Sequence, residues 1–167
     1  MNTREKAKEL AKLAQSLKNT CYHEVGHCVV ARELGIKSEW EIIFEYEKDK
    51  DYIYTQFLGV TSFKRDNSLL TDIRGRITGL AGVVAEAYLL DSNVEPLQIY
   101  RDIKDGSIEL SDTDRIFVSD YFSRQDVGLC LDIVKQRFDL ITQDAESGFS
   151  YYRYLLDECS GLLDEEN

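Results

Sequence analysis

The N-terminal third of the chain places apolar and polar residues with helical spacing. Over residues 4–18, apolar positions recur opposite a charged face, which predicts an amphipathic helix. A second helix is predicted from Asn19 or Thr20, either of which can cap it, to Gly35, a residue suited to the left-handed position after a helix. Because this second segment is apolar on most sides, we expect it in the core. Its apolar residues are Cys21, Tyr22, Val25, Cys28, Val29, Val30, Ala31 and Leu34.

The pattern changes to that of strands between Trp40 and Phe63. The segments 41–47 and 52–63 are rich in aromatic and β-branched residues, and the charged run 48–51 between them predicts a turn. We therefore expect a hairpin or a small sheet. An edge of such a sheet can bind a peptide as an added strand, and a sheet that only covers one face of the core fits the pattern equally well.

A further helix is predicted from Thr71 or Asp72, the two candidate caps, to about Leu90. Three glycines inside it each cost roughly 1 kcal/mol relative to alanine, so a neighbouring element must need close approach there. That neighbour is expected to be the helix over residues 20–34. The three glycines are Gly75, Gly79 and Gly82.

From about Ser111 the sequence predicts helix to the end of the chain, in about three segments. Ser111, with Asp114 three residues later, resembles a capping box that has Asp in place of the usual Glu. Apolar stripes over 127–141 and 149–163 predict packing helices, and residues 164–167 are expected to fray. The expected fold class is α+β, mainly α-helical with a small β-sheet.

The composition fits one domain over residues 1–167, because 43% of the residues are hydrophobic and no repeat or linker interrupts the chain. Lys and Arg total 20 against 31 Asp and Glu, and the net charge of −11 argues against nucleic acid and anionic membranes as partners. With no signal peptide, no apolar span and no paired cysteine motif, the prediction is a cytoplasmic protein with reduced thiols. These thiols, including the two beside the histidines, are expected to be packing residues: Cys21, Cys28, Cys130 and Cys159.

The segment His23-Glu24-Val25-Gly26-His27 is the part of the chain where spacing points to a chemistry. Histidines four residues apart share one face of a helix, so both imidazoles can bind the same zinc ion. Glu24 then lies beside the open position of the metal and can take a proton from its water. Two histidines can also meet by chance in a helix, but both histidines of the chain fall in this segment.

Four stretches in order resemble the FtsH family of ATP-dependent zinc proteases. Residues 22–31, Tyr-His-Glu-Val-Gly-His-Cys-Val-Val-Ala, resemble its Y-H-E-A-G-H-A-hydrophobic segment. Residues 57–61 resemble its A-L-G-Y-T strand, residues 68–71 its Y-L-x-T turn, and residues 80–86 its L-G-G-R-A-A-E helix. The resemblance covers about residues 20–125, and the ordered set is far more specific than H-E-x-x-H alone.

This resemblance implies an FtsH peptidase-like fold, one Zn²⁺, and a third ligand from an Asp that opens a helix after the A-A-E segment. In the family, that Asp is the last residue of an S-N-D or S-D-D sequence. This chain instead reads Ser111-Asp112-Thr113-Asp114, after an apparent insertion between residues 91 and 110. No G-x-x-x-x-G-K-[ST] loop and no apolar span occur, so the family's ATPase module and membrane anchor are absent from the sequence. A separate ATPase or protease subunit and a homo-oligomer are therefore open as partners.

Three carboxylates compete for the position of third ligand: Asp114, Asp112 and Glu86. In a helix that begins near Ser111, Asp114 shares a face with three apolar residues, whereas Asp112 shares a poorer face. We therefore predict Asp114 as the ligand and Glu86 as an acceptor for a metal-bound histidine. The residues that share the face of Asp114 are Val118, Tyr121 and Phe122, and those in phase with Asp112 are Ile116, Ser119 and Asp120.

The predicted function is a zinc-dependent metallopeptidase that hydrolyses peptides or unfolded protein segments. His23, His27 and an Asp hold Zn²⁺, while Glu24 takes a proton from the attacking water and delivers it to the leaving amine. Tyr22 is a candidate donor to the carbonyl oxygen. The alternative is a non-proteolytic or regulatory FtsH-like module that binds zinc and partner proteins. The presence of Glu24 favours the enzyme, since a purely structural site needs no base.

Overall fold

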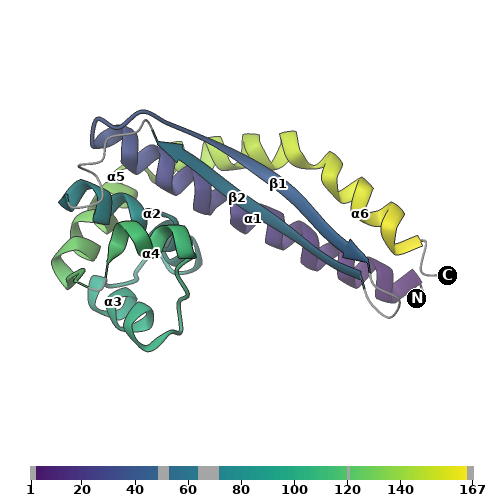
Figure 1. Cartoon of the computed structure of the whole chain (residues 1–167), viewed down its shortest axis with the longest axis horizontal. Helices are drawn as coiled ribbons and strands as arrows, with labels where there is room; N and C mark the ends of the chain where they lie inside the picture. Colours follow the sequence, from purple (N-terminus) through teal and green to yellow (C-terminus); the bar gives the residue numbers. More distant parts are fainter. Residues whose placement is uncertain (1–2, 49–52, 64–71, 120, 165–167) are drawn as a thin grey trace.

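The computed structural model describes residues 3–48, 53–63, 72–119 and 121–164. One long helix runs along most of the length of the molecule (Figure 1). This helix, α1, spans Thr3–Glu33. The predicted break near Asn19 and Thr20 is wrong, because the Thr20 hydroxyl donates to the carbonyl of Ser16 (3.0 Å) from within a continuous helix. No Gly or Pro precedes Gly26, so nothing in the first 25 residues forces the helix to end.

The end of α1 turns the chain into a two-stranded antiparallel sheet. Gly35 has φ 77°, the left-handed conformation predicted for it, and the next amide donates to the carbonyl of Ala31 (2.8 Å). Strands β1 (Ser38–Lys48) and β2 (Ile53–Phe63) then pair from Ser38 opposite Phe63 to Lys48 opposite Ile53. The predicted hairpin is confirmed, while most of its predicted turn lies outside the described residues.

Alternation along the hairpin explains how the sheet packs. Ile42 and Phe57 are buried, whereas Ile43, which points to the opposite face, is partly exposed. One face of the sheet therefore lies against the helices, and the other faces solvent.

Helix α2 (Ile73–Leu90) follows and is buried over most of its length. Its cap is Asp72, whose carboxylate accepts from the amide of Arg74 (3.2 Å); the other candidate, Thr71, lies outside the described residues. Helices α1 and α2 meet where glycines leave room, and a methyl group on Gly26 would lie 2.7 Å from Cβ of Ala85. Of the glycines predicted to allow this approach, Gly82 lies against His23 of α1 as expected, whereas Gly79 lies against Phe117 and Val118 of α4.

The insertion between residues 91 and 110 contains a helix that the sequence analysis missed. Helix α3 (Pro96–Asp105) begins with proline in its first turn and ends at Gly106, which has φ 83°. Its buried residue, Ile99, anchors it to the core. Proline at the start and glycine just past the end are the signals that were available.

The remaining chain forms three helices, with boundaries that differ from those predicted. Helix α4 (Asp112–Val118) begins after the predicted cap, Ser111. Helix α5 (Arg124–Tyr152) is one long helix where the analysis placed a segment end near residue 141, and α6 (Tyr154–Asp164) follows after a short break. The predicted fraying of the C-terminal tail concerns residues that are almost entirely outside the described part of the chain.

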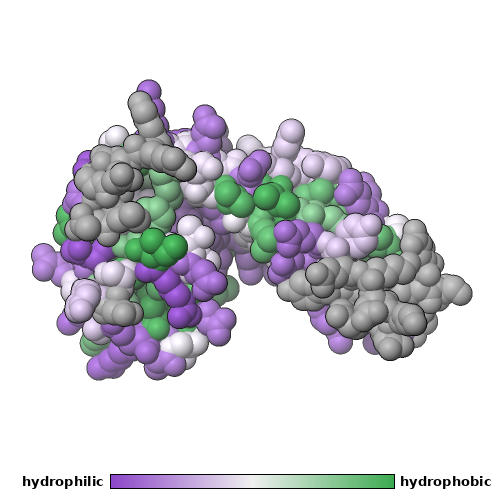
Figure 2. Space-filling view, viewed as in Figure 1, coloured by the Kyte–Doolittle hydropathy of each residue, from purple (hydrophilic) through white to green (hydrophobic). Residues whose placement is uncertain are grey.

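These elements form two connected parts (Figure 1). The hairpin and α5–α6 lie along α1 and make an elongated arm, whereas α2, α3 and α4 gather around one end. Figure 2 shows a hollow between the two parts on the face viewed. The described chain is thus mainly helical with one small sheet, as the α+β prediction states. The core runs through both parts, with fully buried residues that include Leu17, Val29, Leu80, Leu131 and Ile141.

Candidate metal centre

The two histidines lie on one face of α1, as their spacing predicts. Their Nε2 atoms are 3.0 Å apart and point to the same space between α1, α2 and α4. His27 is buried and His23 is mostly buried. A single ion placed there can therefore contact both imidazoles.

Asp114, in the first turn of α4, completes the cluster. Its Oδ1 lies 3.2 Å from Nε2 of His27, and its Oδ2 lies 3.4 Å from Nε2 of His23. Zinc ligands at about 2.0–2.1 Å in tetrahedral geometry are themselves about 3.3 Å apart, so these spacings match three corners of a zinc site. Asp114 is buried, whereas the competing Asp112 is exposed. Among the described residues, the cluster of metal-binding type is His23, His27 and Asp114.

The partners of the outer ring nitrogens fix which atoms face the cluster. Nδ1 of His27 donates to the carbonyl of Thr78 (2.7 Å), an oxygen that can only accept. Nδ1 of His23 donates to Oε1 of Glu86 (3.0 Å). When the rings are neutral, both inner nitrogens therefore present lone pairs, which is the arrangement seen around ligand histidines of metal sites. Glu86 takes the supporting place that the sequence analysis gave it.

Two imidazole lone pairs and a carboxylate at this separation repel one another unless a cation lies among them. Burial lowers the pKa of His23, but its hydrogen bonds to Asp114 and Glu86 outweigh burial and raise that pKa to about 10. Burial also opposes ionisation of Asp114, yet hydrogen bonds from both histidines hold its pKa below the usual range. The carboxylates of Asp114 and Glu86 thus favour a positive charge at this place. A divalent cation fits the same place.

The start of α4 orients the carboxylate of Asp114. The Ser111 hydroxyl accepts from the amide of Asp114 (3.1 Å) and donates to its Oδ2 (2.7 Å). The helix cap and the donor cluster therefore share one hydroxyl group. The cap at Ser111, which the sequence predicted, starts α4 at the position that brings Asp114 within reach of the histidines.

Glu24 lies beside the cluster and is held by β2. The Thr61 hydroxyl donates to Oε2 of Glu24 (2.5 Å) and contacts its main-chain oxygen (3.3 Å). A methyl group on Gly59 would collide with the Glu24 carboxylate, so only glycine lets the strand approach this closely. The roles of Thr61 and Gly59 were missed, because their signal lies in the hairpin register rather than in any local motif.

A second glycine makes room for the cluster from α2. A methyl group on Gly82 would collide with the imidazole of His23. The imidazole of His23 therefore lies directly against the backbone of α2 at Gly82, and this contact limits how the ring can turn. This contact gives a physical reason for a glycine that is costly inside a helix.

The cluster lies in a cleft of about 420 Å³. Its polar lining includes Glu24 and the three donor residues, and apolar side chains from β2 and α4 also line it. A group that enters this cleft would meet both the donor cluster and the Glu24 carboxylate. The apolar lining consists of Phe57, Leu58, Val60, Phe63 and Phe117.

Three other residues near the motif lie away from the cluster. The Tyr22 hydroxyl donates to Oε1 of Glu146 on α5 (3.2 Å), so the proposal of Tyr22 as donor to the substrate oxygen is wrong. Its position follows from the helix, because Tyr22 and His23 project about 100° apart. Cys21 and Cys28 are buried in the core, as predicted, and desolvation raises the pKa of Cys21 to about 12.

Comparison with known proteins places this chain in no established family, since no protein-family model matches it and no curated protein is similar to it. Among the helices that the structure describes, none is both long and apolar enough to cross a membrane.

Proposed function

We propose that the chain is a zinc-dependent metallopeptidase that hydrolyses peptides or unfolded protein segments. The observation that carries this proposal is the pairing of a three-donor cluster, His23, His27 and Asp114, with a carboxylate base, Glu24, in one cleft. Structural zinc sites take four protein ligands, whereas catalytic sites keep a position open for water or substrate. A set of three donors beside a base favours catalysis.

The chemistry of the donors favours zinc as the metal. Two imidazoles and one carboxylate form a common ligand set of catalytic zinc, and the donor spacings fit tetrahedral geometry. Zinc bound there would supply a Lewis acid for the carbonyl oxygen and a water of pKa about 7.

Glu24 is the base in the proposed reaction. Its carboxylate takes a proton from the water that attacks the peptide carbonyl and then delivers this proton to the leaving amine. The Thr61 hydroxyl donates to one oxygen of this carboxylate, and the other oxygen lies against Gly59 of β2. His23 and His27 are kept in the required orientation by Glu86 and the Thr78 carbonyl.

The substrate class follows from the hairpin. Strand β2 pairs with β1 and contributes Phe57–Thr61 to the wall of the cleft. An extended peptide that adds to this strand would bind through main-chain hydrogen bonds, which depend little on sequence. Together with the four ordered motifs, these features support an FtsH-like peptidase domain that takes unfolded segments, alone or delivered by a separate ATPase.

The test begins with metal content. Purified protein should hold about one zinc per chain by elemental analysis, and His23→Ala or His27→Ala should lose it. Glu24→Gln should keep the zinc while cleavage of an unfolded protein such as casein falls about 100-fold or more. Glu41→Gln, on the exposed face of β1, is the matched control and should leave both readouts unchanged.

Two outcomes would change the proposal. Full zinc in both histidine variants would remove the metal centre. A zinc-loaded wild type that cleaves neither casein nor a peptide library would favour the non-proteolytic zinc-binding module instead.

A further inference from the structure

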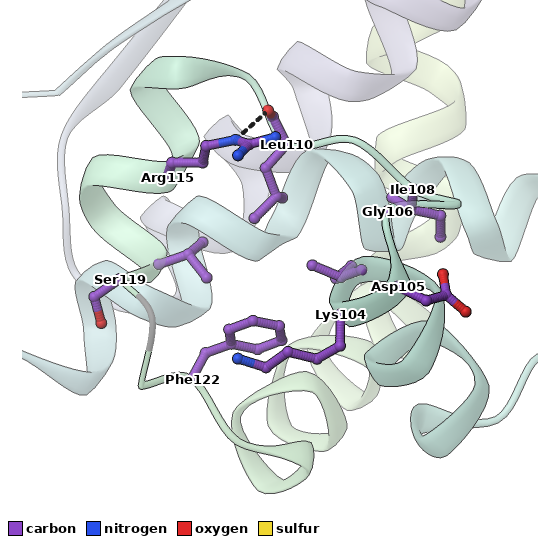
Figure 3. A pocket seen from close by; sticks show the side chains of 10 residues that line it. Lys104, Asp105, Gly106, Ile108, Leu110, Arg115, Ser119 and Phe122 are labelled. Carbon is purple, nitrogen blue, oxygen red and sulfur yellow. Dashed lines mark hydrogen bonds between the residues drawn. The ribbon is translucent and has the colours of Figure 1, made fainter.

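A second pocket, of about 380 Å³, lies on another face of α4 and shares no residue with the metal cleft. It is built by the end of α3, the segment before α4, and the residues that follow α4 (Figure 3). Its size lies within the roughly 300–1,000 Å³ range of small-molecule sites. Much of its wall comes from the insertion that has no counterpart in the motifs described above.

The pocket has an apolar floor. Val118 and Phe122 are buried, and Leu110 projects toward the same space in Figure 3. These side chains offer an aromatic ring and branched aliphatic groups to a ligand. An apolar molecular body is therefore favoured over a fully polar one.

The rim of the pocket carries positive charge, although the whole chain has a net charge of −11. Lys104 places its ammonium 4.3 Å from the centre of the Phe122 ring. Figure 3 shows Lys104 and Phe122 together on one side and Arg115 on the other. Asp105, the acidic residue of the lining, points away from both and accepts from the amide of Ser107 (3.0 Å).

The guanidinium of Arg115 is held in place by one of its nitrogens. Nε donates to the carbonyl of Leu110 (3.1 Å), which fixes the plane of the group. The two terminal nitrogens form the fork that suits a carboxylate. A pre-oriented guanidinium loses less freedom on binding than a mobile one.

The backbone at the rim is strained at Ser119. This residue has φ 54° and ψ 169°, a conformation close to the region that is essentially reserved for glycine. Such strain costs on the order of 1–3 kcal/mol and is concentrated at functional sites.

From these features we propose that this pocket binds a small organic carboxylate with an apolar body. The carboxylate lies between Arg115 and Lys104, and the body lies on Phe122, Val118 and Leu110. Neither the metal nor the peptidase reaction is needed for this binding.

The test uses phenylacetate and metal-free protein, with amide chemical shifts as the readout. Phenylacetate should shift the amides of Gly106, Ile108 and Ser119 and saturate. Its uncharged match, phenylacetamide, and its truncated match, acetate, should each bind at least about tenfold more weakly.

Variants of Arg115 and Lys104 test whether these two side chains bind the carboxylate of phenylacetate. Arg115→Met and Lys104→Met should each weaken phenylacetate about tenfold and leave phenylacetamide within twofold. Arg115→Lys keeps the charge and loses the fork, so its affinity for phenylacetate should lie between those of the wild type and Arg115→Met. Arg101→Met, an exposed cation on α3 outside the pocket, is the control for net charge and should change nothing.

Three results would overturn the proposal. The first is that saturating phenylacetate leaves the pocket amides unshifted in protein whose spectrum is folded. The second is that phenylacetamide, acetate or inorganic phosphate binds as tightly as phenylacetate. The third is that the charge-removing variants bind phenylacetate as the wild type does.

Discussion

Asp114 links the local structure of the chain to the chemistry of the site. Its amide donates to the hydroxyl of the helix cap, Ser111, and its carboxylate reaches Nε2 of both histidines. Asp112 stands two residues earlier, on the solvent side of the same turn. A difference of two positions in a helix is a rotation of about 200°, so only one of these carboxylates can face the cluster.

The first prediction compares these two residues. Asp114→Ala should lower zinc affinity at least about 100-fold, because it removes one of three ligands. Asp112→Ala should change zinc affinity less than threefold and cost only about 0.3–1 kcal/mol of stability through the helix dipole. Competition with a chelating dye measures the affinity, and circular dichroism checks that both variants fold. The opposite ranking would move the third ligand to Asp112.

At this scale, sequence reasoning placed Asp114 by helix phase, and the structure shows where that argument holds. Val118, four residues later, is buried as expected. Tyr121 is 91% exposed, because α4 ends at Val118 and the helical phase does not continue past Ser119. Asp114 still lies with the two histidines, because the first turn of α4, and not the later ones, decides the direction of its side chain.

At the scale of elements, the site depends on how closely three of them approach. Strand β2 contacts Glu24 at Gly59, and helix α2 contacts His23 at Gly82. A side chain at Gly59 would overlap the Glu24 carboxylate, and a side chain at Gly82 would overlap the His23 imidazole. The glycines therefore set the distance between elements, and through it the orientation of the Glu24 and His23 side chains.

The second prediction tests this with Gly82→Ala. The added methyl group must displace the His23 ring or push α2 away from α1, so zinc affinity should fall at least tenfold and stability by about 1–3 kcal/mol. Gly128→Ala in α5 is the control: its nearest neighbours lie at 4.0 Å, and better helix propensity should stabilise the protein by about 0.5–1 kcal/mol. Thermal unfolding and dye competition give the two readouts. Unchanged zinc affinity in Gly82→Ala would show that His23 is not confined by α2.

Elements with strong local sequence signals were predictable, whereas the points where helices begin, end or continue were not. The hairpin and α2 were found because their patterns are long and their caps are explicit. Helix α1 was divided in two, because a residue able to cap at Thr20 does not do so when the helix continues through it. Helix α3 was missed because its ten residues bury one side chain, Ile99, and so carry a weak pattern.

On the scale of the whole molecule, one apolar core connects the arm to the end that holds the site. Cys21 and Cys28 lie on α1, Cys130 lies on α5, and Cys159 lies on α6. All four thiols are buried. Burial raises their pKa values, to about 12 for Cys21 and to about 11 for Cys159. Their reactivity therefore reports how much of the molecule must open to expose them.

The last prediction concerns this opening. A disulfide reagent at pH 8 attacks thiolates, and raised pKa values leave almost none of the buried thiols ionised, so the folded protein should react far more slowly than protein in guanidinium. Cys159 should react first, because terminal α6 packs on little besides α1 and can open alone. The other three should react together at the rate of global unfolding, and Cys159→Ala should remove only the early phase. If all four thiols of the folded protein react at the denatured rate, the arm and the site do not share one cooperative core.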